Sequence, residues 1–304
     1  MNMDNIVFVI LNYNLFKEVV DCVNSIKNKI DTKKYHIIIV DNCSPNNSGM
    51  KLLNYYASEE KVLVKVLDKN LGFAKGNNYG IALARDKFFP KYVCCLNNDT
   101  LLIDDSFFRK VEECYKETNA AVIAPRVYLK DNSIQELIGK LQSKDFYKKL
   151  LYSMSGKGFY GTIHKIKQYL KQIDLIVNIH NSIKQKMQNK LNPLEENKNI
   201  ILHGCCLIFT PVFFRKLIGF NPKTFMFREE ELLFLSLKNN NLTNIYYPKL
   251  EIKHLEDVST NTTFKTNKAK AKFLKDNQIE SLKILINEME VYENLNKVNV
   301  KNNI

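Results

Sequence analysis

The segment that decides the fold is Tyr92-Val93-Cys94-Cys95-Leu96-Asn97-Asn98-Asp99-Thr100. An unbroken apolar run of small, branched and aromatic side chains is followed by a polar cluster with one carboxylate, and a run this short predicts a buried strand. In an open parallel sheet, ligands bind just beyond the carboxyl ends of the strands. Asp99 is therefore expected where a carboxylate can share a divalent cation with substrate phosphates. The alternative interpretation is an ordinary turn, which Asn, Asp and Thr also favour.

Further short apolar runs lie on both sides of this segment and alternate with helical patterns. The predicted strands span residues 6–11, 35–40, 62–67, 92–96 and 120–124, and the predicted helices span 15–27, 50–59, 76–85 and 106–116. Strands that alternate with helices in short units are typical of a parallel sheet. The first 125 residues thus predict an α/β fold with a mainly parallel sheet and helices on both faces.

The second half departs from this alternation. Residues 131–199 are rich in lysine and helical in period, which predicts a mostly helical, basic insertion. The remaining predicted elements are strands at 200–202, 204–209 and 244–247, and helices at 211–217, from 229 onward and at 262–290. We expect one catalytic domain over residues 1–260, followed by a basic helix and tail over 261–304.

Composition and charge narrow the class of protein. The chain has 304 residues, 45% hydrophobic and 25% charged, as is typical of a globular enzyme. No apolar run approaches 18 residues, so we expect a cytoplasmic protein. The net charge of +13 is concentrated between Lys140 and Lys190. The seven cysteines show no CxxC spacing, and neighbouring cysteines on a strand point to opposite faces, so buried free thiols are expected.

Polar residues follow four of the predicted strands. They are Asn12 and Asn14 after the first strand, Asp41 and Asn42 after the second, Asp68 and Asn70 after the third, and Asn97, Asn98 and Asp99 after the fourth. The carboxyl ends of parallel strands lie on one edge of a sheet, so these side chains should converge on one crevice. Gly72, Gly76 and Gly80 follow the third strand, where the start of a helix can offer N–H groups to phosphate. The alternative is a flexible connection from strand to helix.

Together these motifs resemble those of a family 2 glycosyltransferase with the GT-A fold, in the branch of bacterial rhamnosyltransferase-like enzymes. The resemblance rests on Ile39-Val40-Asp41-Asn42-Cys43-Ser44, on Asn70-Leu71-Gly72-Phe73-Ala74-Lys75-Gly76-Asn77 and on Leu96-Asn97-Asn98-Asp99, and it covers residues 4–125 and 200–260. It implies an inverting, metal-dependent transfer of a sugar from a UDP- or dTDP-linked donor to a saccharide or lipid-linked saccharide, in the synthesis of a cell-surface polysaccharide.

The resemblance also implies roles for individual residues. Asp41 would bind the nucleotide base, and Asn97-Asn98-Asp99 would correspond to the DXD motif, with Asp99 on Mn²⁺ or Mg²⁺. His254 would complete the metal site. Glu230 takes the position of the catalytic base, with Glu229 as the second choice, although three adjacent acids could also simply stabilise a helix N-terminus. The residues expected to bind the nucleotide-sugar are Asn12, Asn14, Asp41, Gly72, Phe73, Gly76, Asn77, Asn97 and Asn98.

Two other functions fit the sequence less well. A protein that binds nucleic acid is disfavoured because arginine is scarce and the lysines lie mostly in one segment. A sugar nucleotidyltransferase usually has a glycine-rich loop after its first strand, and Asn12-Tyr13-Asn14 contains no glycine. The basic segment suits a peripheral contact with an anionic membrane, through an apolar stripe flanked by lysines. That stripe, which could instead pack on the catalytic domain or on a second subunit, comprises Ile166, Tyr169, Leu170, Ile173 and Val177, flanked by Lys165, Lys167 and Lys171.

Overall fold

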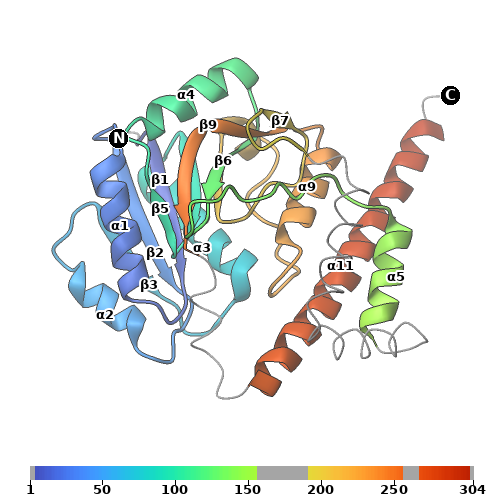
Figure 1. Ribbon diagram of the computed structural model, residues 1–304, viewed down its shortest axis with the longest axis horizontal. Coiled ribbons are helices and arrows are strands. Elements are labelled where there is room, and N and C mark those ends of the chain that lie inside the picture. Colours follow the sequence, from blue (N-terminus) through green and yellow to red (C-terminus); the bar gives the residue numbers. More distant parts are fainter. Residues whose placement is uncertain (1–3, 156–190, 256–266, 302–304) are drawn as a thin grey trace.

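The computed structural model describes residues 4–155, 191–255 and 267–301, which form a mixed α/β fold (Figure 1). In chain order the elements are β1 (Ile6–Asn12), α1 (Lys17–Lys29), β2 (Tyr35–Asp41), α2 (Ser48–Tyr55), β3 (Val62–Val66), α3 (Gly72–Phe88), β4 (Tyr92–Asn97), β5 (Thr100–Leu102), α4 (Phe107–Thr118), β6 (Val122–Tyr128), α5 (Lys144–Met154), β7 (Asn197–Lys198), β8 (Cys206–Phe209), α8 (Pro211–Phe214), α9 (Glu229–Asn239), β9 (Asn244–His254) and α11 (Asn267–Lys301).

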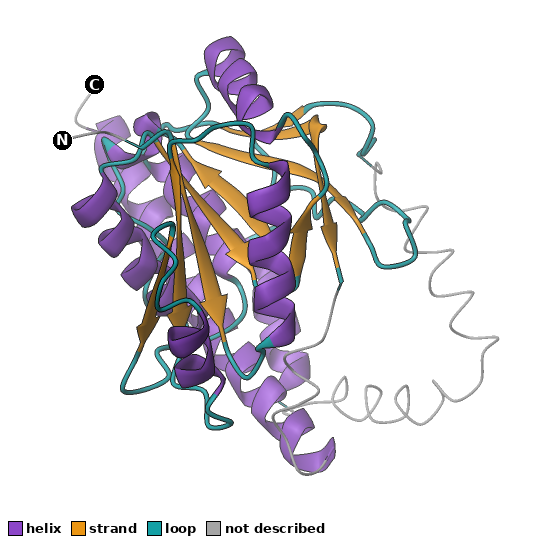
Figure 2. Cartoon of the chain, turned by 90° about the vertical axis from the view of Figure 1, so that its left-hand side faces the viewer, coloured by secondary structure: helices purple, strands orange, loops and turns teal. Residues whose placement is uncertain are grey.

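The strands of the described chain form one sheet in the order β3-β2-β1-β4-β8-β6-β9-β5, and β7 pairs with β9. Strands β3, β2, β1 and β4 are parallel neighbours, and β6 runs parallel to β9. Strand β8 is antiparallel to both β4 and β6. Figure 2 shows the twisted sheet with helices on either side of it. The predicted α/β fold is therefore confirmed.

Side chains that alternate along the strands build a separate core on each face of the sheet. On β1, Phe8 and Ile10 pack with residues of α1, α2 and α4. Val7 and Val9 point to the other face and pack with residues of α3, α8 and α9. Both sets are fully buried, which explains why this strand reads as a continuous apolar run rather than as an alternating one.

Helices α5 and α11 lie side by side beyond the second face (Figure 1). A third apolar cluster joins them to α9. Its buried members are Tyr147 of α5, Leu232 and Leu235 of α9, and Leu282, Leu285, Ile286 and Met289 of α11. This cluster fixes the C-terminal helix against the rest of the fold.

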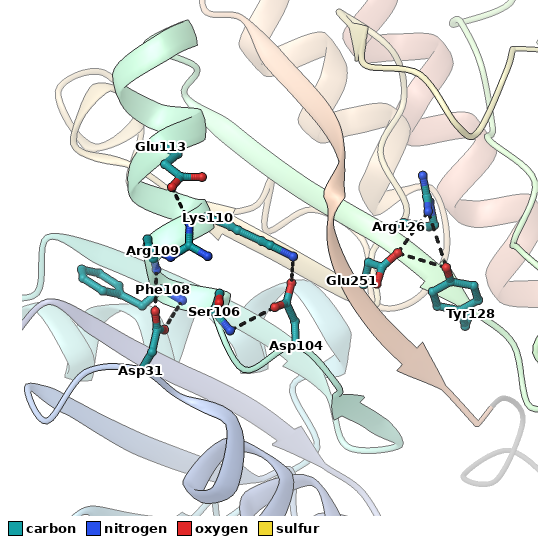
Figure 3. Close-up of polar contacts among 10 residues, drawn as sticks. All are labelled: Asp31, Asp104, Ser106, Phe108, Arg109, Lys110, Glu113, Arg126, Tyr128 and Glu251. Carbon is teal, nitrogen blue, oxygen red and sulfur yellow. Dashed lines mark hydrogen bonds and ion pairs between the residues drawn. The ribbon is translucent and has the colours of Figure 1, made fainter.

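Helix α4 covers the first face and is anchored at its start by acidic side chains. The carboxylate of Asp31 accepts hydrogen bonds from the backbone N–H groups of Phe108, at 2.7 Å, and Arg109, at 3.1 Å (Figure 3). These are donors that a helix N-terminus leaves without an internal partner. Asp104 adds an ion pair to Lys110 at 2.6 Å.

The pairing of β6 with β9 contains an irregularity. The register shifts between Pro125 and Arg126. Beyond the shift, the guanidinium of Arg126 and the hydroxyl of Tyr128 each contact the carboxylate of Glu251 at 3.0 Å (Figure 3). Strand β9 continues from there to pair with β5, with Thr100 opposite His254.

Several predicted boundaries differ from the structure. Helix α3 begins at Gly72 rather than at Gly76, because Asn70 and Phe225 accept the N–H groups of its first turn. The strand predicted at 200–202 is only a bridge between Gly139 and Ile201. The short strand β5 was not predicted, and β9 extends well beyond residue 247. All seven cysteines are free, and all except Cys43 are buried, as expected.

The lysine-rich segment is described in part. Residues 144–154 are helical, whereas 131–143 and 191–199 contain only bridges, turns and the two-residue strand β7. The stripe from Ile166 to Val177 lies outside the described residues. Within the parts of the chain that the structure covers, every helix is too short or too polar to span a lipid bilayer.

Candidate functional site

The polar residues that follow β1, β2 and β4 meet at one edge of the sheet, as the strand pattern predicts. The Nδ2 of Asn12 donates to Oδ1 of Asp41 at 2.8 Å. The Nδ2 of Asn98 donates to Oδ1 of Asn12 at 3.2 Å. Asn12 thus joins the ends of three neighbouring strands.

The carboxylate of Asp41 is held by internal donors. Besides Asn12, it accepts from the hydroxyl of Ser44 at 2.6 Å and from the Ser44 backbone N–H at 3.0 Å. It is 1% exposed, and a Cβ added at Gly49 would lie 2.4 Å from its Oδ2. Hydrogen bonds from three directions hold the carboxylate in one orientation.

Asn14 links the loop after β1 to the loop after β2. Its φ of 65° places it in the left-handed region, which Asn tolerates better than most residues. Its N–H donates to Oγ of Ser44 at 2.8 Å, and its carbonyl accepts from Nδ2 of Asn46 at 2.8 Å. The two loops therefore form one rigid rim around Asp41.

Asn42, which the sequence analysis did not select as a site residue, fixes the start of α3. Its Oδ1 accepts from the N–H of Leu71 at 2.8 Å, and its Nδ2 donates to the carbonyl of Gly72 at 3.1 Å. Gly72 has a φ of +79°, and a Cβ there would lie 2.2 Å from the carbonyl oxygen of Phe225. This close approach requires glycine.

The next residues of α3 serve mainly in packing. The N–H of Phe73 donates to the carbonyl of Phe225 at 2.8 Å. A Cβ at Gly76 would lie 2.5 Å from Cδ1 of Leu11, so close packing of α3 on β1 accounts for this glycine. The buried Asn77 donates from Nδ2 to the carbonyl of Phe73 at 3.1 Å. Only Phe73 of these three predicted residues lines the pocket described below.

Asp99 and His254 lie side by side, although 155 positions separate them in sequence. Their Oδ1 and Nε2 atoms are 3.1 Å apart, and both side chains are buried. The N–H of Leu255 donates to the carbonyl of Asp99 at 2.9 Å, which extends the pairing of β9 with β5. Asn97 is held from another side, because its N–H donates to the carbonyl of Cys205 at 2.9 Å.

His203 is a neighbour of this pair that the sequence did not indicate, since a histidine beside an apolar run reads as a core residue. Its ring centroid lies 5.9 Å from that of His254. Its Nδ1 accepts the N–H of Cys205 at 3.3 Å. Burial, and next the neighbouring His254, lowers the pKa of His203 to about 4, so the ring is neutral at physiological pH.

Asp99 and His254 fit a cation that a substrate's phosphates also bind. Mg²⁺ is usually held by one or two carboxylates together with substrate phosphates. The Nδ1 of His254 is buried, and no hydrogen-bond partner for it exists in the described chain. The described part of the chain contains no group of three or more His, Cys, Asp or Glu side chains that could hold a metal ion. The chemistry therefore suits a shared cation better than a closed structural site.

Three acids stand at the start of α9, directly after a tight turn. Phe227 and Arg228 both adopt left-handed conformations, with φ of 74° and 66°. Such backbone is costly for bulky residues and concentrates at functional sites. Glu229 accepts from Oγ1 of Thr224 at 3.3 Å. Burial, and next the charge of Glu230, raises the pKa of Glu229 to about 8.

Glu230 is partly exposed and lies against the chain before β8. A Cβ added at Gly204 would lie 2.7 Å from its Oε1. Burial raises the pKa of Glu230, while the N–H groups of Glu230 itself and of Gly204 oppose the shift. The segment from His203 to Cys205 thus separates the Asp99–His254 pair from the acids of α9.

A pocket of about 310 Å³ opens beside these acids. Its lining comes from α3, from the turn and start of α9, and from α11, and comprises Phe73, Phe227, Arg228, Glu229, Glu230, Glu231 and Gln278. The volume lies at the lower end of the range for small-molecule sites, about 300–1,000 Å³. Gln278 was not predicted, because no pattern in the sequence places α11 at this site.

Comparisons with known proteins indicate the family and the fold of the chain. The family model described as glycosyl transferase family 2 matches residues 7–175, more than half of the chain. Two curated relatives, both named poly-beta-1,6-N-acetyl-D-glucosamine synthase and both from Staphylococcus epidermidis, are 25% identical over 144 residues, 47% of this chain. The chain spans only 33% of their length. The crystal structure of S. aureus TarS 1-349 superposes with a TM-score of 0.50 at 13% identity, covering 83% of this chain and 60% of that one, which supports the fold.

Proposed function

Because the chain belongs to glycosyl transferase family 2, we propose that it transfers a sugar from a UDP- or dTDP-linked donor to a saccharide or lipid-linked saccharide, with inversion and with the help of Mn²⁺ or Mg²⁺. The product would belong to a cell-surface polysaccharide. The curated relatives carry a polysaccharide synthase name, which supports a saccharide acceptor.

One observation carries this proposal: a connected line of polar residues runs along the sheet edge. It passes from Asp41 through Asn12 and Asn98 to the Asp99–His254 pair, and then through the segment from His203 to Cys205 to Glu230. A nucleotide-sugar needs a base-binding end, a diphosphate-binding middle and a reacting end in that order. The three clusters follow the same order.

In this assignment Asp41 and the rim around it recognise the nucleotide base, as the family resemblance implies. The oxygens of this carboxylate are hydrogen-bond acceptors, and uracil and thymine carry an N3–H donor. Its 1% exposure means that the base would have to contact the loop that surrounds Asp41 as well as the carboxylate itself.

Asp99 and His254 would hold the cation. When bound, a divalent ion supplies neutralisation of the charge that develops on the departing diphosphate. The buried carboxylate of Asp99 is kept in place by its contact with His254 and by the pairing of β5 with β9.

Glu230 would take the proton of the acceptor hydroxyl as it attacks the anomeric carbon. A raised pKa improves a carboxylate as a proton acceptor, because the best general base has a pKa near the working pH. Glu229, with a pKa of about 8, holds a proton at neutral pH and so does not add a second negative charge beside Glu230.

The test is release of nucleoside diphosphate from a panel of UDP- and dTDP-sugars with Mn²⁺, with Mg²⁺ and with EDTA. We expect turnover with one donor class, loss of turnover in EDTA, and loss of turnover in Asp99→Ala. Full activity in EDTA or in Asp99→Ala would contradict the metal assignment. An absence of release from every donor would contradict the function itself.

A further inference from the structure

The C-terminal helix forms one wall of the pocket that contains the acids. Gln278 of α11 faces the same cavity as Glu229 and Glu230. It is partly exposed, and no hydrogen bond joins its amide to another residue of the described chain. Its amide therefore offers hydrogen-bond donors and an acceptor to a ligand in this pocket.

Contacts along α11 fix the helix to the turn that precedes the acids. The hydroxyl of Ser281, one turn after Gln278, donates to the carbonyl of Met226 at 2.6 Å. Ser281 is 2% exposed. A helical serine commonly bonds to a carbonyl of its own helix, whereas this one bonds to the loop directly before the left-handed residues.

Two further contacts lie on either side of Ser281. The rings of Phe273 and Phe225 meet edge to face at a centroid distance of 6.3 Å. Further along the helix, Glu288 forms an ion pair with Lys223 at 2.5 Å. Because contacts on both sides of Gln278 hold α11 to the loop, its distance from the acids is set by the fold.

The other side of α11 is anchored as well. Lys144 pairs with Glu293 at 2.6 Å, and Lys148 pairs with Glu290 at 2.8 Å, which joins α11 to α5. Together with the apolar cluster shared with α9, these contacts make α11 part of the catalytic unit rather than an appended tail.

The chemistry of the pocket suits a neutral sugar. Three carboxyl groups face a single guanidinium, that of Arg228, which already pairs with Glu231 at 2.5 Å. With its guanidinium engaged by Glu231, Arg228 leaves no unpaired cation among the lining residues for a phosphate. The rings of Phe73 and Phe227 offer apolar area for the C–H face of a sugar, and the carboxyl and amide groups can bind its hydroxyls.

We propose that α11 completes the acceptor site and that Gln278 binds a hydroxyl or carbonyl group of a neutral saccharide acceptor. This inference rests on the proposed function. Gln278 would influence which saccharide is accepted. A saccharide without the matching group would leave the amide of Gln278 without a hydrogen bond in the closed site, and would therefore bind more weakly.

Saturation-transfer NMR with a panel of neutral disaccharides, including N,N′-diacetylchitobiose and cellobiose, tests binding without turnover. We expect the wild-type chain to bind at least one of them, and Gln278→Ala to bind it about 3- to 10-fold more weakly, the loss of one hydrogen bond. Asn287→Ala, which removes an amide from the exposed side of the same helix, should bind like the wild type. Equal binding by Gln278→Ala and wild type, or no binding of any disaccharide to the wild type, would overturn the proposal.

Steady-state kinetics separate this inference from the proposed function. Gln278→Ala should raise the KM for the bound disaccharide by a similar factor and leave the KM for the nucleotide-sugar unchanged. A wild-type protein that releases no nucleoside diphosphate argues against the function. An active Gln278→Ala variant with an unchanged acceptor KM argues only against the role of Gln278.

Discussion

Two clusters at opposite ends of the site, Asp41 with its hydrogen-bond donors and the acids of α9, differ in how their carboxyl groups are held. Asp41 accepts three hydrogen bonds from Asn12 and Ser44 and is shielded from solvent. Glu229 has one long contact to Thr224, and its pKa and that of Glu230 are raised by burial. The first cluster holds its carboxylate rigidly as a hydrogen-bond acceptor, whereas burial in the second cluster favours protonated carboxyl groups. This difference suits recognition at one end and chemistry at the other.

The largest expected effect comes from removing the proton acceptor of the second cluster. Glu230→Gln keeps the shape of the side chain, and a general base contributes about 10²–10⁴-fold to turnover. We expect kcat to fall by that factor while donor affinity, measured by calorimetry, stays the same. If Glu229→Gln is inactive and Glu230→Gln is active, the base is Glu229 and the comparison holds with the two residues exchanged.

A smaller effect is expected from displacing Glu230 without changing it. In Gly204→Ala the new methyl group would meet Oε1 of Glu230, a flexible side chain, and the backbone of Gly204 is outside the left-handed region. The variant should fold normally, by circular dichroism and melting temperature, yet lose activity by about 10²-fold, the cost of a misplaced catalytic group.

A second substitution, at Glu230, can relieve the clash in Gly204→Ala. Glu230→Asp shortens the side chain by one methylene and leaves room for the methyl group at position 204. We expect the double variant Gly204→Ala/Glu230→Asp to be at least as active as Gly204→Ala alone. Wild-type activity in Gly204→Ala would show that the contact with Gly204 does not position the base.

The first cluster should respond in binding and stability rather than in turnover. Asp41→Asn places an NH₂ group against donors of Asn12 and Ser44, and hydrogen bonds to a charged group contribute about 1.5–3 kcal/mol each. We expect weaker donor binding in calorimetry and a lower free energy of unfolding, with a smaller change in kcat. Asp68→Asn, at an exposed carboxylate after β3, is the control. An unchanged donor affinity in Asp41→Asn would remove the base-binding role.

The smallest effect concerns the pH dependence of stability. The folded-state pKa of Glu229 is raised to about 8, so the folded protein binds a proton that the unfolded chain releases near pH 4.5. The associated stability is complete below pH 4.5 and is lost as the pH rises through 8. Denaturant unfolding between pH 5 and 8 should show a decline on the order of a few kcal/mol in the wild type.

Glu229→Gln should reduce that decline, because glutamine does not titrate. Glu280→Gln, on an exposed position of α11, should leave it unchanged. A decline of the same size in Glu229→Gln and wild type would place the titrating group elsewhere.

The first half of the sheet was predictable to within a few residues. Strands β1, β2 and β4 are largely buried on both faces, so each appears in the sequence as a short apolar run with polar residues after it. The convergence of Asn12, Asp41 and Asn98 follows from parallel pairing alone. The free cysteines follow from their positions in apolar runs.

The second half was predicted less well because its site depends on pairings between distant residues. The short strand β5 has too few residues to leave a pattern, and β9 pairs with both β6 and β5 across a register shift after Pro125 that no local pattern reveals. The position of His203 beside His254 and that of Gln278 beside the acids have no local signature at all.

The sequence by itself determined the alternation of strands and helices, the sheet edge at which polar residues gather, and the identity of the acids in the second half. These depend on local periodicity and on the geometry of parallel strands, which act over a few residues. Only the tertiary structure decided that His203 lies beside His254, that Gly204 receives Glu230, and that α11 closes the pocket with Gln278. Those contacts join residues far apart in the chain, and the packing of whole elements against each other fixes them.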